Sequence, residues 1–122
     1  MKIKLLPQDF SVCKLPDLKM IDLSDEYVFI AKTDEEISLV CSSGRVPAAA
    51  TDCESGWRGF RIEGTLDFSL VGILAKVSSA LADHGISIFA ISTYNTDYVL
   101  TKAENLDKAA GVLQSQGWEI TV

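Results

Sequence analysis

The sequence holds one histidine and three cysteines, which is little material for a metal centre or a nucleophilic site. Cys13, Cys41 and Cys53 lack C-x-x-C spacing, so neither a zinc site nor a disulfide framework is predicted. We expect each cysteine to act as a small core residue. A nucleophilic cysteine would need a neighbouring base, and His84 is distant in sequence and predicted to close a helix.

Basic residues and long apolar runs are also scarce. The chain has 11 Lys and Arg residues and 17 Asp and Glu residues, which gives a formal net charge of −6. Nucleic acid is therefore not an expected partner, because a phosphate backbone binds clustered cations. No apolar run reaches the ~18 residues that cross a bilayer, and the N-terminal apolar stretch is too short for a secretory signal. We expect a cytoplasmic protein with no membrane partner.

Catalytic motifs are absent as well. The chain has no G-x-S-x-G, no phosphate-binding P-loop and no H-E-x-x-H. We therefore predict that it is not an enzyme and that it needs neither a metal nor a cofactor.

The second half of the chain alternates between strand-like and helix-like patterns. Strands are predicted over 57–63, 86–94, 97–101 and 118–122, and helices from about residue 69 to Gly85 and over 106–116. Asp67 or Ser69 is predicted to cap the first helix, and Gly85 to end it. The apolar face of that helix carries Leu70, Ile73, Leu74, Val77 and Leu81. The order strand, helix, strand, strand, helix, strand predicts an α+β, ferredoxin-like fold.

The first half predicts mainly strand and loop, with strands over 9–15, 27–33 and 37–41. We place the domain boundary between residues 56 and 57. The stretch 86–94 is apolar at nearly every position, which predicts that both faces of this strand are covered. We expect both the first half and a second copy of the chain to supply that cover.

Two segments could bind a ligand. The first strand–helix junction, residues 63–74, would present free backbone N–H groups to a carboxylate. The predicted hairpin at 93–98 gathers hydroxyls, an amide and Asp97, which could receive an ammonium or guanidinium group. Ordinary helix capping and turn chemistry would explain both segments equally well, so the residues alone leave a binding role open.

These same segments carry a resemblance to a known family. The run from Arg61 to Ile88, with Gly72-Ile73-Leu74 opening the helix and His84-Gly85-Ile86-Ser87-Ile88 following it, resembles an ACT domain. The residues 67–72 and 86–98 resemble a group of small tandem-ACT proteins, similar to the C-terminal ACT pair of aspartate kinases and to the CASTOR arginine sensors. The resemblance implies that residues 57–122 are an ACT domain and residues 1–56 a reduced, mostly β, ACT-like half.

The resemblance also implies a ligand site between two ACT units, at which an amino acid binds without being transformed. In arginine-sensing relatives an acidic residue in a position like that of Asp97 faces the guanidinium. The implied ligand-binding residues are Leu66, Asp67, Phe68, Ser69, Leu70, Val71, Gly72, Ile86, Ser87, Ile88, Thr93, Asn95, Thr96 and Asp97.

Two functions remain open at this point. The chain could be an amino-acid-binding allosteric regulator that acts as a homodimer. Alternatively, it could be a protein–protein interaction or dimerisation module that keeps the fold without a ligand. Asp67 and Asp97 favour the first function, because two carboxylates suit a cationic amino acid.

Overall fold

The computed structural model describes residues 1–63 and 72–122. The chain divides into two compact units, one formed by Gln8–Trp57 and the other by Met1–Pro7 with Arg58–Val122. Strands β1 (Lys2–Leu15) and β4 (Asp52–Glu63) each contribute to both units. No helix within the described ranges is long and apolar enough to cross a membrane.

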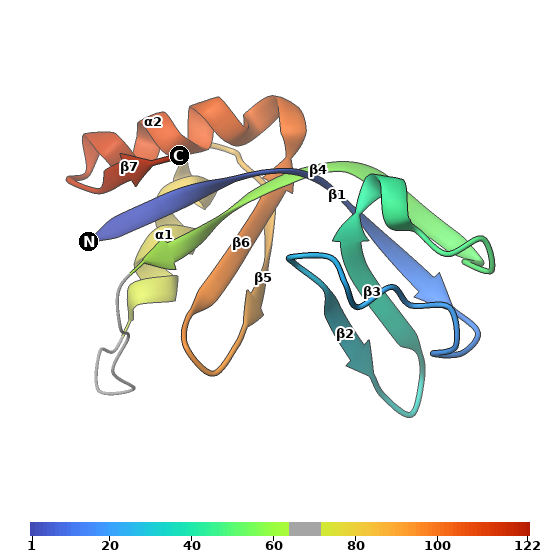
Figure 1. Cartoon of the computed structure of the whole chain (residues 1–122). Helices are drawn as coiled ribbons and strands as arrows, with labels where there is room; N and C mark the ends of the chain where they lie inside the picture. Colours follow the sequence, from blue (N-terminus) through green and yellow to red (C-terminus); the bar gives the residue numbers. More distant parts are fainter. Residues whose placement is uncertain (64–71) are drawn as a thin grey trace. The chain divides into compact units, whose positions relative to one another are not determined.

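The larger unit has the predicted ferredoxin-like order. The end of β4 is followed by α1 (Ile73–Asp83), β5 (Ile88–Ser92), β6 (Asp97–Lys102), the short 3₁₀ helix η2 (Ala103–Asn105), α2 (Leu106–Ser115) and β7 (Glu119–Thr121). Strand β6 lies between β4 and β5, which leaves β5 at the edge, and β7 pairs in parallel with the start of β1. Both helices lie on one face of these strands (Figure 1). The predicted α+β fold class is confirmed.

The core of this unit lies between the sheet and the two helices. Phe60 and Ile62 of β4 are fully buried, as is Val99 of β6. They belong to the same buried cluster as Leu81 of α1 and Leu113 of α2. Alternation along the strands and the three- and four-residue spacing along the helices therefore place the apolar side chains on facing surfaces.

The start of α1 differs from the prediction. Gly72 occupies the N-cap position with φ of 84°, no side chain caps the helix there, and the first helical residue is Ile73. The described helix therefore begins later than predicted, and the predicted cap residues, Asp67 and Ser69, lie outside the described residues. A left-handed residue at this position favours glycine, which has no Cβ to clash with the backbone. At the other end, Gly85 follows the C-cap His84 with φ of 71°, as predicted.

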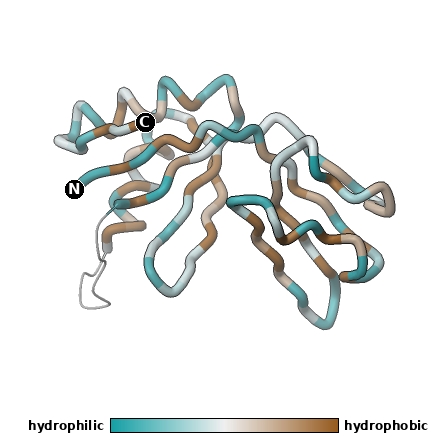
Figure 2. The backbone as a smooth tube through the Cα atoms, viewed as in Figure 1, coloured by the Kyte–Doolittle hydropathy of each residue, from teal (hydrophilic) through white to brown (hydrophobic). Residues whose placement is uncertain are grey.

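The smaller unit consists of two antiparallel pairings and long connections. Strand β2 (Phe29–Lys32) pairs with β3 (Ile37–Ser42), and β3 pairs with the C-terminal half of β1. The 3₁₀ helix η1 (Ser43–Arg45) follows β3. The core of the smaller unit contains Cys13, Leu15, Leu39 and Cys41. Partly buried apolar side chains pack against it from the strands and loops: Ile21, Val28, Ile37, Val46 and Ala50. Figure 2 shows apolar strands joined by more polar turns.

The β2–β3 and β5–β6 hairpins repeat each other sixty residues apart, a relation that our reading of the sequence missed. In the first, Thr33 N–H donates to Glu36 O at 2.9 Å, and in the second, Thr93 N–H donates to Thr96 O at 2.8 Å. The registers also correspond, since Lys32 pairs with Ile37 and Ser92 with Asp97. Strands β3 and β6 share the same burial pattern, and each leads directly into a 3₁₀ helix.

Candidate functional site

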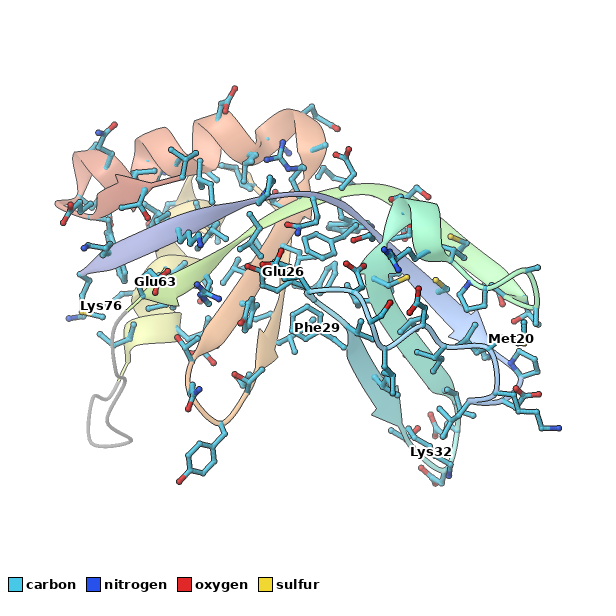
Figure 3. All side chains as sticks on the ribbon, viewed as in Figure 1. Met20, Glu26, Phe29, Lys32, Glu63 and Lys76 are labelled. Carbon is cyan, nitrogen blue, oxygen red and sulfur yellow. The ribbon has the colours of Figure 1, made fainter. Side chains whose placement is uncertain are left out.

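The candidate site lies at the end of the larger unit where the β5–β6 turn meets the end of β4. The Thr96 hydroxyl donates a 2.6 Å hydrogen bond to the backbone oxygen of Ile62. The Thr93 hydroxyl donates to Thr96 O at 2.9 Å, which fixes the turn internally. The hydroxyl-rich turn is thus tied to β4 one residue before that strand ends at Glu63, which is labelled in Figure 3.

Asp97 stands at the base of this turn. It is directly opposite Ser92 in the register of β5 and β6, and the Ser92 hydroxyl donates to its carboxylate at 2.6 Å. A hydrogen bond to an ionised carboxylate is short and strong compared with a neutral one, so it holds the Asp97 side chain in one orientation. The structure therefore presents an oriented, half-buried carboxylate at the position predicted to receive a cation.

Arg61, Glu63 and Tyr98 complete this end of the sheet, and we had not predicted them as site residues. The Arg61 guanidinium donates to the Glu63 carboxylate at 3.0 Å and lies 6.0 Å from the centre of the Tyr98 ring. Hydrogen bonding to Tyr98 and to Glu63 raises the pKa of Arg61 above its usual value, so its positive charge is firmly held.

The alternation of residues over 57–63 could have indicated that Arg61 and Glu63 share one face of this strand. Phe60 and Ile62 are buried, so Arg61 and Glu63 fall on the opposite face of β4, away from the helices. What the sequence does not indicate is that β6 brings Tyr98 beside them, because strand pairing is non-local.

The structure does not bring all the predicted ligand-binding residues together within one copy. Ile88 pairs with Thr101 at the far end of β5, four residues from the Ser92–Asp97 pair. At ~3.3 Å per residue, the separation is ~13 Å. Ile86 is buried in the core, and Ser87 O accepts a 3.2 Å hydrogen bond from the Thr101 hydroxyl. The segment 86–88 is therefore not part of the same end of this unit as the turn.

Of the remaining predicted residues, Asn95 and Gly72 are described by the structure and six are not. Asn95 is exposed in the β5–β6 turn beside Thr96. Gly72 begins α1, and because the end of α1 leads within a few residues to the start of β5, its start lies toward the β5–β6 turn. Leu66, Asp67, Phe68, Ser69, Leu70 and Val71 lie outside the described residues.

Across residues 1–63 and 72–122, no group of three or more His, Cys, Asp or Glu side chains is arranged to hold a metal ion. The chemistry available at the β5–β6 turn is instead that of the Asp97 carboxylate and several hydroxyls, whereas the Arg61–Glu63 ion pair lies on the opposite face of the sheet. Such a set can bind an ammonium or guanidinium group through charge-assisted hydrogen bonds, each worth about 1.5–3 kcal/mol.

Comparisons with known proteins agree with this architecture. Residues 52–115 match the ACT-domain family. A crystal structure of an Agobacterium tumefaciens protein is 31% identical to the chain, covers 98% of it and 90% of the other chain, and has a TM-score of 0.86.

Two more distant structures share the fold alone. A Vibrio cholerae protein of unknown function, described as a possible transport protein, is 23% identical over 93% of this chain and 88% of that one, with a TM-score of 0.75. The ligand-free regulatory subunit of Thermus thermophilus aspartate kinase is 13% identical over 96% of this chain and 98% of that one, with a TM-score of 0.65. The comparison with curated proteins gave no match.

Proposed function

The chain belongs to the ACT-domain family, whose domains have a regulatory, small-ligand-binding role, and we propose that it binds a cationic amino acid as an allosteric effector. In this proposal it performs no chemistry itself. The observation that carries the proposal is the oriented Asp97 carboxylate beside the hydroxyls of the β5–β6 turn. Asp97 would receive the side-chain cation.

The position of β5 favours a site completed by a second copy. It is the edge strand of the larger unit, Ala90 on it is exposed, and Ile88, Phe89 and Ile91 are only partly buried. An exposed apolar edge strand is a template for pairing with another chain. If two β5 strands pair antiparallel about a two-fold axis that passes at Ala90, Ile88 of one copy comes beside Ser92 of the other. That pairing would bring together the two groups of ligand-binding residues that one copy keeps apart.

A thermal-shift screen of the intact chain against the common amino acids at millimolar concentration tests ligand binding. A ligand at a hundredfold excess over its Kd stabilises the folded chain by ~2.7 kcal/mol. We expect lysine or arginine to raise the melting temperature most. Absence of a shift with every amino acid would contradict the proposal.

The variant Asp97→Asn tests the role assigned to this carboxylate. It keeps the shape of the side chain and removes its charge, so the shift with the cationic amino acid should fall to near zero. Asp34→Asn is the matched control, because Asp34 lies in the turn of the repeated β2–β3 hairpin. An unchanged shift in Asp97→Asn would place the cation elsewhere.

One observation favours the alternative function, a ligand-free protein–protein interaction module. The loop between β1 and β2 exposes Leu18, Met20 and Leu23, with 46%, 66% and 71% of their surfaces accessible. Met20 stands out from this loop in Figure 3. Exposed apolar side chains gathered in one loop are typical of contact surfaces. This function predicts self-association by analytical ultracentrifugation, no thermal shift with any amino acid, and an association constant unaffected by Asp97→Asn.

A further inference from the structure

All three cysteines of the chain lie in the smaller unit, on three different strands. Cys13 is on β1, Cys41 on β3 and Cys53 on β4. Cys13 and Cys41 are buried in the core, as predicted, whereas Cys53 is exposed. The prediction that each cysteine is a core residue is therefore wrong for Cys53. No bond links the three sulfurs in the reduced protein, so the strand registers decide which pair can form one.

The register between β1 and β3 separates Cys13 from Cys41. Cys13 pairs directly with Leu39, and Cys41 pairs directly with Ser11. The two cysteines are thus diagonal neighbours, for which the Cα–Cα distance is ~7–8 Å. A disulfide usually requires a Cα–Cα distance of about 4.4–6.8 Å. A diagonal pair lies at or beyond the upper end of that range, so a Cys13–Cys41 bond would require the two strands to shift.

Cys13 and Cys53 are placed differently. The hydroxyls of Ser11 and Ser55 lie 2.9 Å apart, so these two residues face each other across β1 and β4. Thr51 N–H donates to Lys14 O, so β4 runs antiparallel to β1. Cys13 is two residues after Ser11 and Cys53 two residues before Ser55. The Ser11–Ser55 contact therefore places Cys13 and Cys53 close together on neighbouring strands, and the Thr51–Lys14 bond beyond them is offset by one residue from the Ser11–Ser55 register.

Two further observations concern the surroundings of Cys13 and Cys53. Cys13 and Cys53 line the same surface hollow of about 310 Å³, together with Lys14 and several acidic side chains. Burial and the neighbouring thiols of Cys41 and Cys53 raise the pKa of Cys13 to about 12, so its thiol keeps its proton at neutral pH. Of the two cysteines, the exposed Cys53 meets an oxidant from solvent first.

We propose that Cys13 and Cys53 form a reversible cross-strand disulfide when a hydroperoxide oxidises the Cys53 thiol. The Cys53 thiolate attacks one oxygen of hydrogen peroxide, so that an S–O bond forms, the O–O bond breaks and the departing hydroxide takes a proton to become water. The Cys13 sulfur then attacks the Cys53 sulfenic acid: the S–S bond forms, the S–O bond breaks, and the leaving hydroxyl departs with the Cys13 proton as a second water. Two thiols and one peroxide thus give one disulfide and two waters.

The disulfide closes the chain between residues 13 and 53 and joins β1 to β4. Such a cross-link restricts the unfolded chain and so stabilises the folded one. Strand β4 continues from Cys53 to Arg61 and Glu63, so the strand fixed by the disulfide is the one that carries these two side chains.

The test treats the reduced, full-length chain at low concentration with a small excess of hydrogen peroxide, followed by thiol counting in denaturant and peptide mapping without reductant. We expect two of the three thiols to disappear, the mass to fall by about 2 Da for the two hydrogens lost, and the linked peptide to join Cys13 with Cys53. The oxidised chain should unfold at a higher urea concentration, and dithiothreitol should reverse both changes.

Variants separate this disulfide from other products. Cys53→Ser, at an exposed position, should keep both remaining thiols and show no urea shift after peroxide, while Cys41→Ser should still form the link. A Cys13–Cys41 peptide, a disulfide between two chains, or Cys53 oxidised to sulfinic acid without any link would each overturn the proposal. If Cys41→Ser fails to fold, the wild-type peptide map decides alone. No ligand enters this experiment, so its outcome is independent of amino-acid binding.

Discussion

The β2–β3 and β5–β6 hairpins have the same register and the same turn hydrogen bond, yet different structures cover them. In the larger unit α1 and α2 supply Val77, Leu81 and Leu113 to one continuous core. In the smaller unit loops take the place of helices, and a few side chains such as Ile21, Val28 and Val46 complete a much smaller core. The hairpin is therefore held by its own strand pairing, whereas the layer packed against it can be helix or loop.

The largest expected effect compares the two cores by the same substitution. Leu81→Ala removes a fully buried side chain from between helix and sheet, and we expect a loss of about 3–5 kcal/mol in the free energy of unfolding. Leu39→Ala, also fully buried, should cost about 2–3 kcal/mol, because loops can collapse further into the space left. Urea unfolding of both variants measures the difference. Equal losses would show that the loops pack as rigidly as the helices.

A glycine comparison should give the next largest effect. A Cβ at Gly59 would lie 2.8 Å from the backbone oxygen of Val99 and 3.1 Å from the Leu100 side chain. Gly59→Ala therefore forces β4 and β6 apart, at a cost of about 1–3 kcal/mol. Gly44→Ala in η1 is the control, because a Cβ there meets nothing within 4 Å. A neutral Gly59→Ala in thermal unfolding would mean that the two strands separate easily.

The repeated turns should respond alike. The Thr33 hydroxyl accepts from the N–H groups of Glu35 and Glu36, and the Thr93 hydroxyl donates to Thr96 O. Thr33→Ala and Thr93→Ala should each lower the free energy of unfolding by about 0.5–1.5 kcal/mol, since each loses a net hydrogen-bond contribution. A tenfold difference in their effects on the unfolding constant would show that the two hairpins are not energetically equivalent.

The smallest expected effect concerns the polar contacts that hold the loop of the smaller unit. Arg45 forms ion pairs with Asp22 and, at 3.9 Å, with Asp25. Hydrogen bonding from Ser42, together with the Arg45 charge, lowers the pKa of Asp25 below its ordinary value. The stabilisation is therefore fully present above pH ~4, the unfolded pKa, and is lost as the pH falls through the lower folded pKa.

Urea midpoints of wild type and Asp25→Asn, measured from pH 7 to pH 2, check this sign. The difference between the two proteins should be constant near neutral pH and shrink below pH ~4. A difference that grows on acidification would contradict the assignment. Glu119→Gln, an exposed acid on β7 of the larger unit, serves as a control without an ion pair among the described residues.

Much of the larger unit could be predicted from sequence because its patterns are local. Ile73 to Leu81 follow helical spacing, and Gly85 marks the helix end that the structure confirms. The end of the first helix was predictable and its start was not, since Gly72 adopts a left-handed conformation that residue spacing does not reveal. The hairpin repeat was hidden because, between residues 29–45 and 89–105, only Phe29 with Phe89 and Thr33 with Thr93 are identical.

The candidate site was only partly predictable. Asp97 and Thr96 lie in the short turn whose composition suggested a site, and the structure ties both to neighbouring strands. The contact between Arg61 and Tyr98 could not be predicted, because the two residues belong to strands more than thirty residues apart in sequence. The sequence also placed the segment 86–88 in the same site as the turn. In the structure the two lie at opposite ends of β5.

The order of strands and helices in the larger unit, the buried faces of its helices and the ACT-family resemblance follow from sequence alone, because periodicity and turn residues act over a few positions. The cover predicted for both faces of 86–94 is absent within one copy, where no residue of β5 is fully buried. Tertiary structure alone decided which side chains share a space. It placed Asp97 opposite Ser92, Arg61 beside Tyr98, and Ser11 against Ser55. The physical reason is strand register, since a shift of one residue turns every side chain to the other face and the register depends on the packing of the whole sheet.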